Sequence, residues 1–324
     1  MGAGDPAALP ASAGAAARFS GGPPSAGGLH GAAAAAGAPA SGARATRCRV
    51  YPVLENELLS QDVHRLWIEA PHVARKRKPG QFVIIRVGEE GERIPLTIAD
   101  VDTARGAIAL IVQGVGKSTR ELNLVPAGGT VLDVAGPLGR PTHIEPGAHV
   151  CCVGGGIGAA VVYPIACGVK ASGGRVTAIL GGRTKDLVLL EREMRAVADA
   201  CHVTTDDGSA GAKGLVTDAL SAIIAEGVRI DEVVAVGPVP MMRAVCELTR
   251  PLGLKTTVSL NPVMVDGTGM CGGCRVLIGG QQKFVCVDGP EFDGHLVDFG
   301  ELSARLRAYR SQEAESLTHY CASH

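Results

Sequence analysis

The sequence has 324 residues, enough for roughly two domains of ordinary size, each with its own core. Its 31 basic and 32 acidic residues give a formal net charge of -1, so no overall field favours nucleic acid or an anionic membrane. The ten cysteines occur without an apolar run of ~20 residues and without a convincing signal peptide, which argues against a disulfide scaffold. We therefore expect a cytoplasmic protein whose partners bind at local sites.

Residues 1–46 consist almost entirely of Ala, Gly, Pro and Ser, with no periodic pattern of bulky apolar residues. Such a segment cannot bury enough surface to offset the entropy of ordering it, so we predict a disordered extension. A transit peptide and a start codon placed too far upstream are the alternatives.

Short apolar segments separated by Gly and Pro turns follow in residues 47–145. The segments expected to form strands are 63–69, 81–87, 107–112 and 130–134. Short strands with turn signals every 10 to 20 residues are typical of an antiparallel barrel of ~100 residues. We predict that residues 47–145 form such a barrel as the first domain.

A different rhythm of strand, glycine turn, helix and strand occupies residues 146–259. It includes a strand at 150–153, a glycine turn at 154–156, a helix that ends at about 171, and the segments 175–180, 191–200, 216–226 and 232–236. This alternation predicts a doubly wound parallel α/β sheet. Beyond it we expect a cysteine- and glycine-rich module over 260–300 and a C-terminal helix and tail over 301–324, with the helix at 299–312.

The strongest chemical signal is a group of three cysteines. Cys271 and Cys274 enclose two glycines, and eleven residues separate Cys274 from Cys286. Thiolates at this spacing, on a loop whose glycines let the backbone wrap around an ion, indicate a metal site. Asp266 stands five residues before Cys271, which is the spacing of the first two cysteines in the plant-type [2Fe-2S] pattern. We predict that Asp266, Cys271, Cys274 and Cys286 are the ligands.

A zinc site is the alternative for these cysteines, with His295 as the fourth ligand. The glycine-rich loop favours the [2Fe-2S] cluster, because backbone N–H groups around the inorganic sulfurs tune its potential.

A glycine turn between an apolar strand and a helix indicates a nucleotide site. Glycines there let a pyrophosphate approach the helix N-terminus, whose free N–H groups can donate hydrogen bonds to its negatively charged oxygens. The expected residues are Gly154, Gly155, Gly156, Gly158, Gly237, Pro238 and Arg183. A tight structural turn is the alternative for the glycines, and a solvated surface side chain is the alternative for Arg183.

Two segments of the first domain indicate a second dinucleotide. Arg93 and Thr97 lie four positions apart on an expected strand, and a turn rich in glycine and hydroxyl groups follows a later strand. An arginine together with such a turn can hold a flavin pyrophosphate. The candidate residues are Arg93, Pro95, Leu96, Thr97, Gly114, Gly116, Ser118 and Thr119. Ordinary surface residues are the alternative for each segment taken alone.

The order of these motifs resembles the ferredoxin reductase superfamily, typified by the electron-transfer subunit of dihydroorotate dehydrogenase. The resemblance covers about residues 47–312 and is strongest with the small subunits of NADH-dependent reduced ferredoxin:NADP oxidoreductase, also known as sulfide dehydrogenase. The matching segments are 78–83, 92–100, 154–158, 204–208, 260–274 and 286–293. The dihydroorotate dehydrogenase subunits resemble this chain less at position 266, where they would carry a cysteine.

The resemblance implies an oxidoreductase subunit that uses FAD, a [2Fe-2S] cluster and NAD(H) or NADP(H). It implies that Thr97 lies near flavin N5, that Arg93 pairs with the FAD pyrophosphate, and that Gly116, Ser118 and Thr119 seat its phosphates. It also implies a larger partner subunit with flavin and [4Fe-4S] centres, and a bifurcation reaction involving ferredoxin. No acid, base or nucleophile is expected, and we interpret Asp206, Asp207 and Asp288 as turn residues.

Three hypotheses follow from this pattern. The first is an electron-transfer subunit of a bifurcating complex, and the second is the corresponding subunit of dihydroorotate dehydrogenase. The third is a zinc-stabilised module that binds nicotinamide nucleotides and performs no catalysis.

Overall fold

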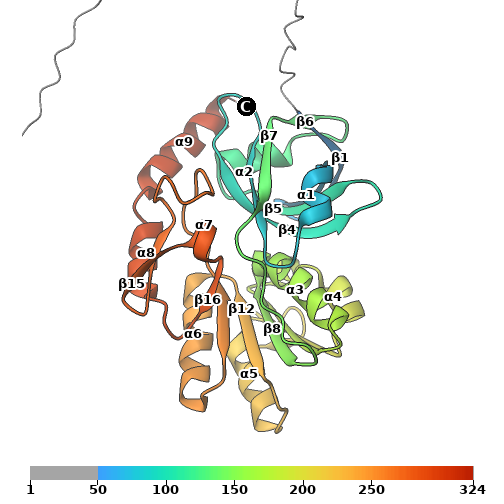
Figure 1. The fold of residues 1–324 in the computed structure, drawn as a ribbon, viewed down its shortest axis with the longest axis vertical. Coiled ribbons are helices and arrows are strands. Elements are labelled where there is room, and N and C mark those ends of the chain that lie inside the picture. Colours follow the sequence, from blue (N-terminus) through green and yellow to red (C-terminus); the bar gives the residue numbers. More distant parts are fainter. Residues whose placement is uncertain (1–49, 324) are drawn as a thin grey trace, which may run out of the picture. The chain divides into compact units, whose positions relative to one another are not determined.

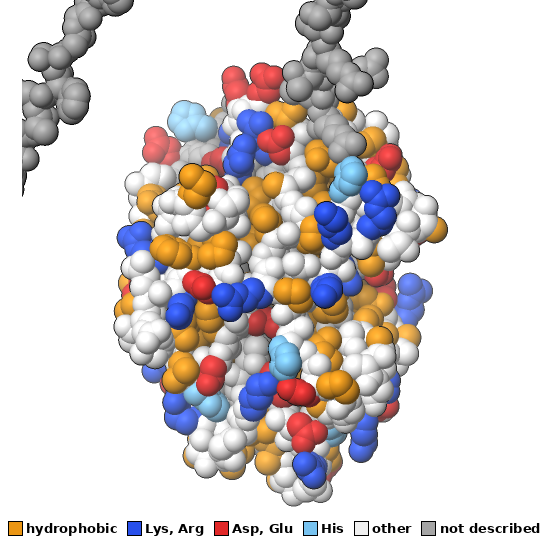
Figure 2. All heavy atoms as spheres, viewed as in Figure 1, with side chains coloured by type: hydrophobic (Ala, Val, Ile, Leu, Met, Phe, Trp, Pro, Cys, Tyr) orange, Lys and Arg blue, Asp and Glu red, His pale blue; other side chains and the backbone are white. Residues whose placement is uncertain are grey.

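The computed structural model describes residues 50–323, so the extension predicted over 1–46 lies outside the described residues. Two seven-stranded sheets and one two-stranded hairpin form its frame (Figure 1). Within the described residues, no helix is long and apolar enough to cross a membrane. On the face shown in Figure 2, basic, acidic and apolar side chains are interspersed, as the near-zero net charge leads one to expect.

The first sheet is the predicted antiparallel barrel, with the strand order β6-β1-β2-β5-β4-β3-β7. Its strands are β1 (Tyr51–Ser60), β2 (Val63–Glu69), β3 (Phe82–Arg86), β4 (Ile94–Asp102), β5 (Ala107–Gln113), β6 (Thr130–Val131) and β7 (Asp133–Leu138). The two edge strands, β6 and β7, are separated only by Leu132, whose N–H donates to the carbonyl of Arg86 on β3. The sheet therefore curls until it is nearly closed. Helices α1 (Pro71–Lys76) and α2 (Lys117–Asn123) complete the barrel.

Strand β5 illustrates why the barrel packs against its neighbour. Six consecutive residues from Ala107 to Val112 are buried. Ile108 and Leu110 belong to the barrel core, whereas Ile111 packs into the core of the second sheet. Because successive strand residues point to opposite faces, a strand that is apolar at every position is buried on both sides.

The second sheet has the order β11-β10-β9-β8-β12-β13-β16. Its strands are β8 (His149–Gly155), β9 (Arg175–Gly182), β10 (Ala200–Thr205), β11 (Ala212–Lys213), β12 (Glu232–Val236), β13 (Thr256–Ser259) and β16 (Glu291–Asp293). All pairs are parallel except β13 with β16. The chain proceeds from β8 outward in one direction and then returns to β12 on its other side. This reversal makes a topological switch point between β8 and β12.

Helices cover both faces of this sheet, as a doubly wound fold requires. On β8, Cys152 faces a core with α3 (Ala159–Ala171) and α4 (Glu191–Val197). Cys151 faces the opposite core, with α5 (Val216–Ala225) and α6 (Val239–Thr249). Three short 3-10 turns, Gly156–Gly158, Lys185–Leu187 and Arg250–Leu252, connect these elements.

The cysteine-rich segment forms a small module that shares the core of α6. It contains the hairpin β14 (Arg275–Ile278) and β15 (Gln281–Phe284), the short helix α7 (Val285–Asp288) and then β16. Two helices follow, α8 (Phe299–Leu306) and α9 (Arg310–Ser323). Cys274 and Cys286 lie in the same core as Met242 and Val245 of α6, so the module is packed onto the second sheet and its helices.

The single helix predicted over 299–312 is wrong in extent. The structure ends α8 at Leu306 and begins α9 at Arg310. Leu302 is fully buried and Arg305 donates to the carbonyl of Gly273, so α8 is fixed against the hairpin. No residue of α9 whose side chain is described is buried. No buried contact of these residues therefore holds α9 in line with α8.

Candidate functional site

A cavity of about 750 Å³ lies where the parallel strands of the second sheet end. The turns after β8, β9, β10 and β12 line one side, and Phe82, Pro95, Leu96 and Thr97 of the barrel line the other. Ser259 and Leu260 at the end of β13, together with Asn261 and Met264 of the cysteine-rich segment, form a third wall. A cavity at the carboxyl ends of the strands, next to the switch point, is where doubly wound folds bind nucleotides.

The glycine turn after β8 forms the floor of this cavity. Gly155, Gly156 and Gly158 line it, whereas Gly154 is buried beneath Ala159. A Cβ on Gly158 would lie 2.0 Å from the carbonyl oxygen of Val236, so the first turn of the α3 region touches the backbone of β12. Only glycine permits this approach. Gly237 and Pro238 stand beside the turn, which supports a seat for a pyrophosphate.

Two oppositely charged side chains follow neighbouring strands at the cavity edge. Arg183 comes directly after β9, and Asp206 comes directly after β10. Both are exposed, and neither side chain makes a hydrogen bond or ion pair to another described residue. They are therefore available to a ligand. Asp206, expected to serve only a turn, also lines the cavity. Asp207 does serve its turn, by accepting from the N–H and the hydroxyl of Ser209.

The barrel brings Thr97 to the cavity from β4, opposite Phe82 of β3. The hydroxyl of Thr97 has no hydrogen-bond partner among residues 50–323. An apolar wall of Phe82, Pro95 and Leu96 with one free hydroxyl suits a flat aromatic ring that needs a single polar contact. The residues present therefore fit a flavin ring.

The residues predicted to hold the flavin pyrophosphate lie outside the cavity. Arg93 is exposed and stands 3.8 Å from Asp133, which also holds Arg86 at 2.7 Å. The hydroxyl of Ser118, at the start of α2, donates to the carboxylate of Glu92. The Ser118 hydroxyl already donates to an anionic oxygen, and Arg93 is only weakly paired. Both groups are donors that can bind a phosphate.

The turn that precedes α2 holds the other residues of the predicted flavin seat. Thr119 is engaged in the turn itself: its hydroxyl accepts from the N–H of Gly116 and donates to the carbonyl of Gly116. A Cβ on Gly116 would meet nothing within 4 Å, so the space above this turn is open. Gly114 is closed in by Arg120 and Asn123 at 3.4 Å.

The structure brings two of the four predicted metal ligands into contact. The sulfurs of Cys274 and Cys286 lie 3.2 Å apart and are buried, and burial raises the pKa of the Cys286 thiol to about 12. Cys271 is exposed on the loop. Within residues 50–323, no three His, Cys, Asp or Glu side chains converge as a metal site. Three sulfurs within one short segment nevertheless fit a thiolate-held cluster by donor chemistry.

Asp266 organises the loop between itself and Cys271. One carboxylate oxygen accepts from the N–H of Thr268 and the other from the N–H of Cys271, both at 2.8 Å. These bonds, with that from Thr268 the largest cause, lower the pKa of Asp266. A Cβ on Gly267, whose φ is +74°, would lie 2.6 Å from Leu138, so the loop passes close to the barrel. Asp266 thus has a structural role besides any role as a ligand.

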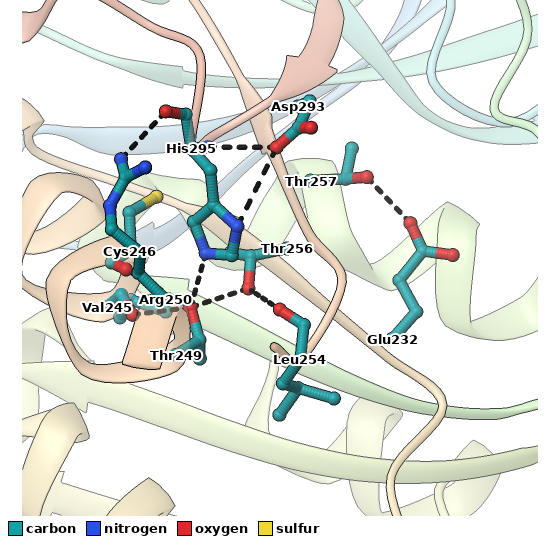
Figure 3. A network of polar contacts seen from close by, with 10 residues as sticks. All are labelled: Glu232, Val245, Cys246, Thr249, Arg250, Leu254, Thr256, Thr257, Asp293 and His295. Carbon is teal, nitrogen blue, oxygen red and sulfur yellow. Dashed lines mark hydrogen bonds and ion pairs between the residues drawn. The ribbon is translucent and has the colours of Figure 1, made fainter. Parts of the chain in front are cut away.

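His295, the fourth ligand of the zinc alternative, is hydrogen-bonded to α6 and belongs to no group of potential metal ligands within residues 50–323. Its Nε2 lies 3.0 Å from the hydroxyl of Thr249 on α6, and Thr256 donates to the same hydroxyl (Figure 3). Arg250 donates to the carbonyl of His295. The histidine therefore joins the module to α6 and β13, and the structure argues against the zinc site.

A nearly closed barrel beside a doubly wound sheet, with a cavity where they meet, defines an oxidoreductase of the ferredoxin reductase type. Residues 261–298 match the family model described as the iron-sulfur cluster binding domain of dihydroorotate dehydrogenase B. The chain is 49% identical over 81% of its length to a Thermotoga maritima homologue of the dihydroorotate dehydrogenase B (NAD(+)) electron transfer subunit, covering 92% of that protein. A Bacillus caldolyticus electron transfer subunit is 36% identical over 74% of this chain and 94% of its own. The chain belongs to this family.

Solved structures agree with the assignment. One, from a study of flavin-based electron bifurcation by the NADH-dependent reduced ferredoxin-NADP oxidoreductase, matches with a TM-score of 0.80 and 47% identity over 84% of this chain and 98% of that chain. Phthalate dioxygenase reductase matches with a TM-score of 0.51 and 16% identity, which supports the fold alone. The predicted fold class, the resemblance, the oxidoreductase class and the cofactor types are confirmed.

Proposed function

We propose that this chain passes electrons from NADH through FAD to a [2Fe-2S] cluster and from there to a larger subunit. The observation that carries the proposal is that three parts of the chain line the same cavity: the glycine turn of the second sheet, Thr97 of the barrel and Met264 of the cysteine-rich segment. A nicotinamide, a flavin and a route to the metal can meet only at a place to which all three parts contribute.

The predicted residues that line the cavity from the glycine turn and from β4 have these roles in the proposal. Gly155, Gly156 and Gly158 let the nucleotide pyrophosphate approach the backbone, and Gly237 and Pro238 bound the nicotinamide. Thr97 would donate a hydrogen bond to the flavin near N5, and Pro95 and Leu96 would pack on its ring. FAD, when bound, would supply the exchange between two-electron hydride chemistry and one-electron transfer. Hydride transfer requires no acid or base from the protein, so the part of the chain is to position these groups.

The flavin phosphates would be held at a distance from the cavity. Arg93 and Ser118 supply charge and a hydroxyl, while Gly114, Gly116 and Thr119 shape the turn. In this proposal a phosphate oxygen replaces the carboxylate of Glu92 as the acceptor of the Ser118 hydroxyl. The carboxylate must move away because it would repel the negatively charged phosphate.

The choice of NADH over NADPH depends on the two charged residues at the cavity edge. The carboxylate of Asp206 can accept hydrogen bonds from ribose hydroxyls and repels a 2'-phosphate, whereas Arg183 would favour it. The names of the relatives, NAD(+) and NADH-dependent, support NADH. We therefore assign the ribose contact to Asp206.

The partner we propose is a larger subunit with flavin and [4Fe-4S] centres, in a reaction that links ferredoxin, NAD(H) and NADP(H) by electron bifurcation. The match to the ferredoxin-NADP oxidoreductase structure over 98% of that chain supports it. Asp266, where the dihydroorotate dehydrogenase subunits would carry cysteine, favours it further. The second candidate is the electron-transfer subunit of dihydroorotate dehydrogenase, which the names of the other relatives support. The proposed setting for either is the cytoplasm, where thiols stay reduced.

The composition of the purified protein tests this proposal. We expect the full chain, purified without oxygen, to contain one FAD and about two irons per chain, as a [2Fe-2S] centre requires. We expect zinc to be absent. Colourless protein that contains zinc instead of iron would contradict the proposal, and the partner that co-purifies from the native source separates the two candidate complexes.

A further inference from the structure

Glu291 lies where three parts of the chain meet. It begins β16 and is the register partner of Ser259 at the end of β13. Its Oε1 accepts a hydrogen bond of 2.7 Å from the hydroxyl of Thr142, on the segment that joins the barrel to β8. A Cβ on Gly80, in the turn before β3, would lie 2.6 Å from the same oxygen. The carboxyl group is thus enclosed by the barrel, the linker and the sheet, although the residue keeps some exposed surface.

The carboxyl group of Glu291 is also next to the wall of the cavity. Ser259 and Pro290 both line the cavity, and Leu260 donates its N–H to the carbonyl of Pro290. Glu291 is therefore one residue away from the wall on its own strand and directly opposite a wall residue on the next strand. Glu291 also follows α7, the helix that carries Cys286, after only two residues. Charge that enters the cavity or the cysteine-rich module therefore acts on a carboxyl that is only partly in contact with water.

No cation balances Glu291 in the part of the chain that the structure describes. Glu232 on β12 has the same sign when ionised and adds to the rise in the pKa of Glu291. Its carboxylate is engaged with Lys255 at 2.9 Å and accepts from the hydroxyl of Thr257, the second contact being drawn in Figure 3. On β8, Cys152 stays a neutral thiol because burial holds its pKa well above its usual range.

The other charged groups of the adjoining segments have partners or lie in solvent. Arg140 on the linker bonds the carbonyl of Val287 and stands 3.5 Å from Asp288. His143 pairs with Glu145, and both are exposed. Lys78, in the turn before β3, and Asp293 at the end of β16 are exposed. Burial, opposed by the Thr142 hydrogen bond and reinforced by Glu232, therefore raises the pKa of Glu291 to about 7.

We infer that Glu291 binds a proton when electrons enter this site, and so links electron transfer to the uptake of one proton. The electrons come from the reduced nicotinamide of the proposed function, on which this inference rests. The proton comes from solvent and forms an O–H bond at a carboxylate oxygen, with no other bond broken in the protein. Each added electron makes the neutral carboxyl more favourable, because an uncompensated anion in a poorly solvated position is repelled by further negative charge.

The direction of the pH dependence follows from the sign of the charge. Below about pH 7 Glu291 is already protonated, so reduction takes up no proton there. Above it, the oxidised protein carries the carboxylate and reduction must bind a proton. The midpoint potential of the iron-sulfur cluster is therefore expected to fall as the pH rises through and above neutral, and to level off again once the reduced form also stays ionised.

The test is a redox titration of the full chain with its cofactors, repeated from below to well above neutral pH. The cluster is the centre to follow, because it takes up one electron and its signal is separate from that of the flavin. Glu291→Gln keeps an acceptor oxygen for Thr142 but cannot ionise. We therefore expect the cluster potential of this variant to lose the fall near neutral pH, which is called the wave below. The matched control is Glu145→Gln, which removes an exposed carboxylate of the same linker and is expected to keep the wave.

A second variant keeps the inference testable if Glu291→Gln does not fold. Thr142→Val removes the hydrogen bond that stabilises the carboxylate, so the wave should move to higher pH. Infrared difference spectra of reduced minus oxidised protein should show a protonated carboxyl band in the wild type and none in Glu291→Gln. A wave unchanged in both variants overturns the inference while the proposed function stands. A wild type without flavin and iron overturns both.

Discussion

Replacing Cys274 with serine is expected to remove the iron from this protein while FAD stays bound. Cys274 is buried in the core of the module, its sulfur lies 3.2 Å from that of Cys286, and a serine hydroxyl is a far poorer ligand for iron than a thiolate. The proposed flavin residues Pro95, Leu96 and Thr97 lie on β4, and Leu96 packs on the barrel core rather than on the core that contains Cys274. Iron should fall from about two per chain to nearly none, and NADH should still bleach the flavin. Iron analysis and the visible spectrum measure both effects.

The matched control is Cys167→Ser, which changes a partly buried cysteine of α3 outside the module. We expect it to keep both iron and flavin. If Cys274→Ser kept its iron, Cys274 would not be a ligand.

Asp266 requires its own variants because it holds the loop as well as being a candidate ligand. Asp266→Ala removes both acceptor oxygens and is expected to lose or destabilise the cluster while FAD stays bound. Asp266→Asn keeps one acceptor oxygen and loses the charge. Iron lost in both variants supports a ligand role, whereas iron lost only in Asp266→Ala indicates that Asp266 merely shapes the loop. Unchanged iron and unchanged potential in both would contradict the assignment.

Gly158→Ala is expected to impair the nucleotide site severely. The new methyl group would lie 2.0 Å from the carbonyl oxygen of Val236, which is backbone and cannot turn aside. The start of α3 must therefore move away from β12, at a cost of about 1–3 kcal/mol in the free energy of unfolding. A displacement of about 1 Å at a binding site can reduce the rate ~100-fold, so we expect a loss of at least about tenfold in the rate of flavin reduction by NADH.

The control for this variant is Gly88→Ala, at a position where a Cβ would meet nothing within 4 Å and where φ is not in the left-handed region. It should leave both the unfolding transition and the rate of flavin reduction unchanged. Reduction of the flavin by a chemical reductant should stay normal in Gly158→Ala, which separates nucleotide binding from flavin binding. Wild-type NADH kinetics in Gly158→Ala would show that the nucleotide binds elsewhere.

The sequence was most informative where a periodic apolar segment was followed directly by a glycine-rich turn. An apolar strand, a glycine turn and an apolar helix predicted β8, the cavity floor and α3, because few other structures need that order. The barrel was also predictable from its short strands and turns. The burial of β5 on both faces was not foreseen, because whether an apolar run faces one core or two depends on what packs against it.

Other features depend on contacts between segments distant in sequence. Asp206 looked like part of an Asp-Gly turn, and only the parallel arrangement of β9 and β10 brings it beside Arg183. Glu291 gave no signal at all, since its environment comes from Gly80, Thr142 and Ser259. His295 had a spacing suited to zinc, but its ring is held by Thr249 of α6. The break between α8 and α9 likewise follows from the anchoring of Leu302 and Arg305 rather than from helix propensity.

An anaerobic titration of the full chain with NADH tests the central claim most directly. If the chain carries electrons from NADH through a flavin to a cluster, both chromophores must respond to the same reductant. We expect NADH to bleach the flavin and also to produce the paramagnetic signal of a reduced [2Fe-2S] cluster, with a total of roughly three electrons accepted per chain, two by the flavin and one by the cluster. Flavin bleaching with a cluster that no amount of NADH reduces, although a chemical reductant does, would contradict it.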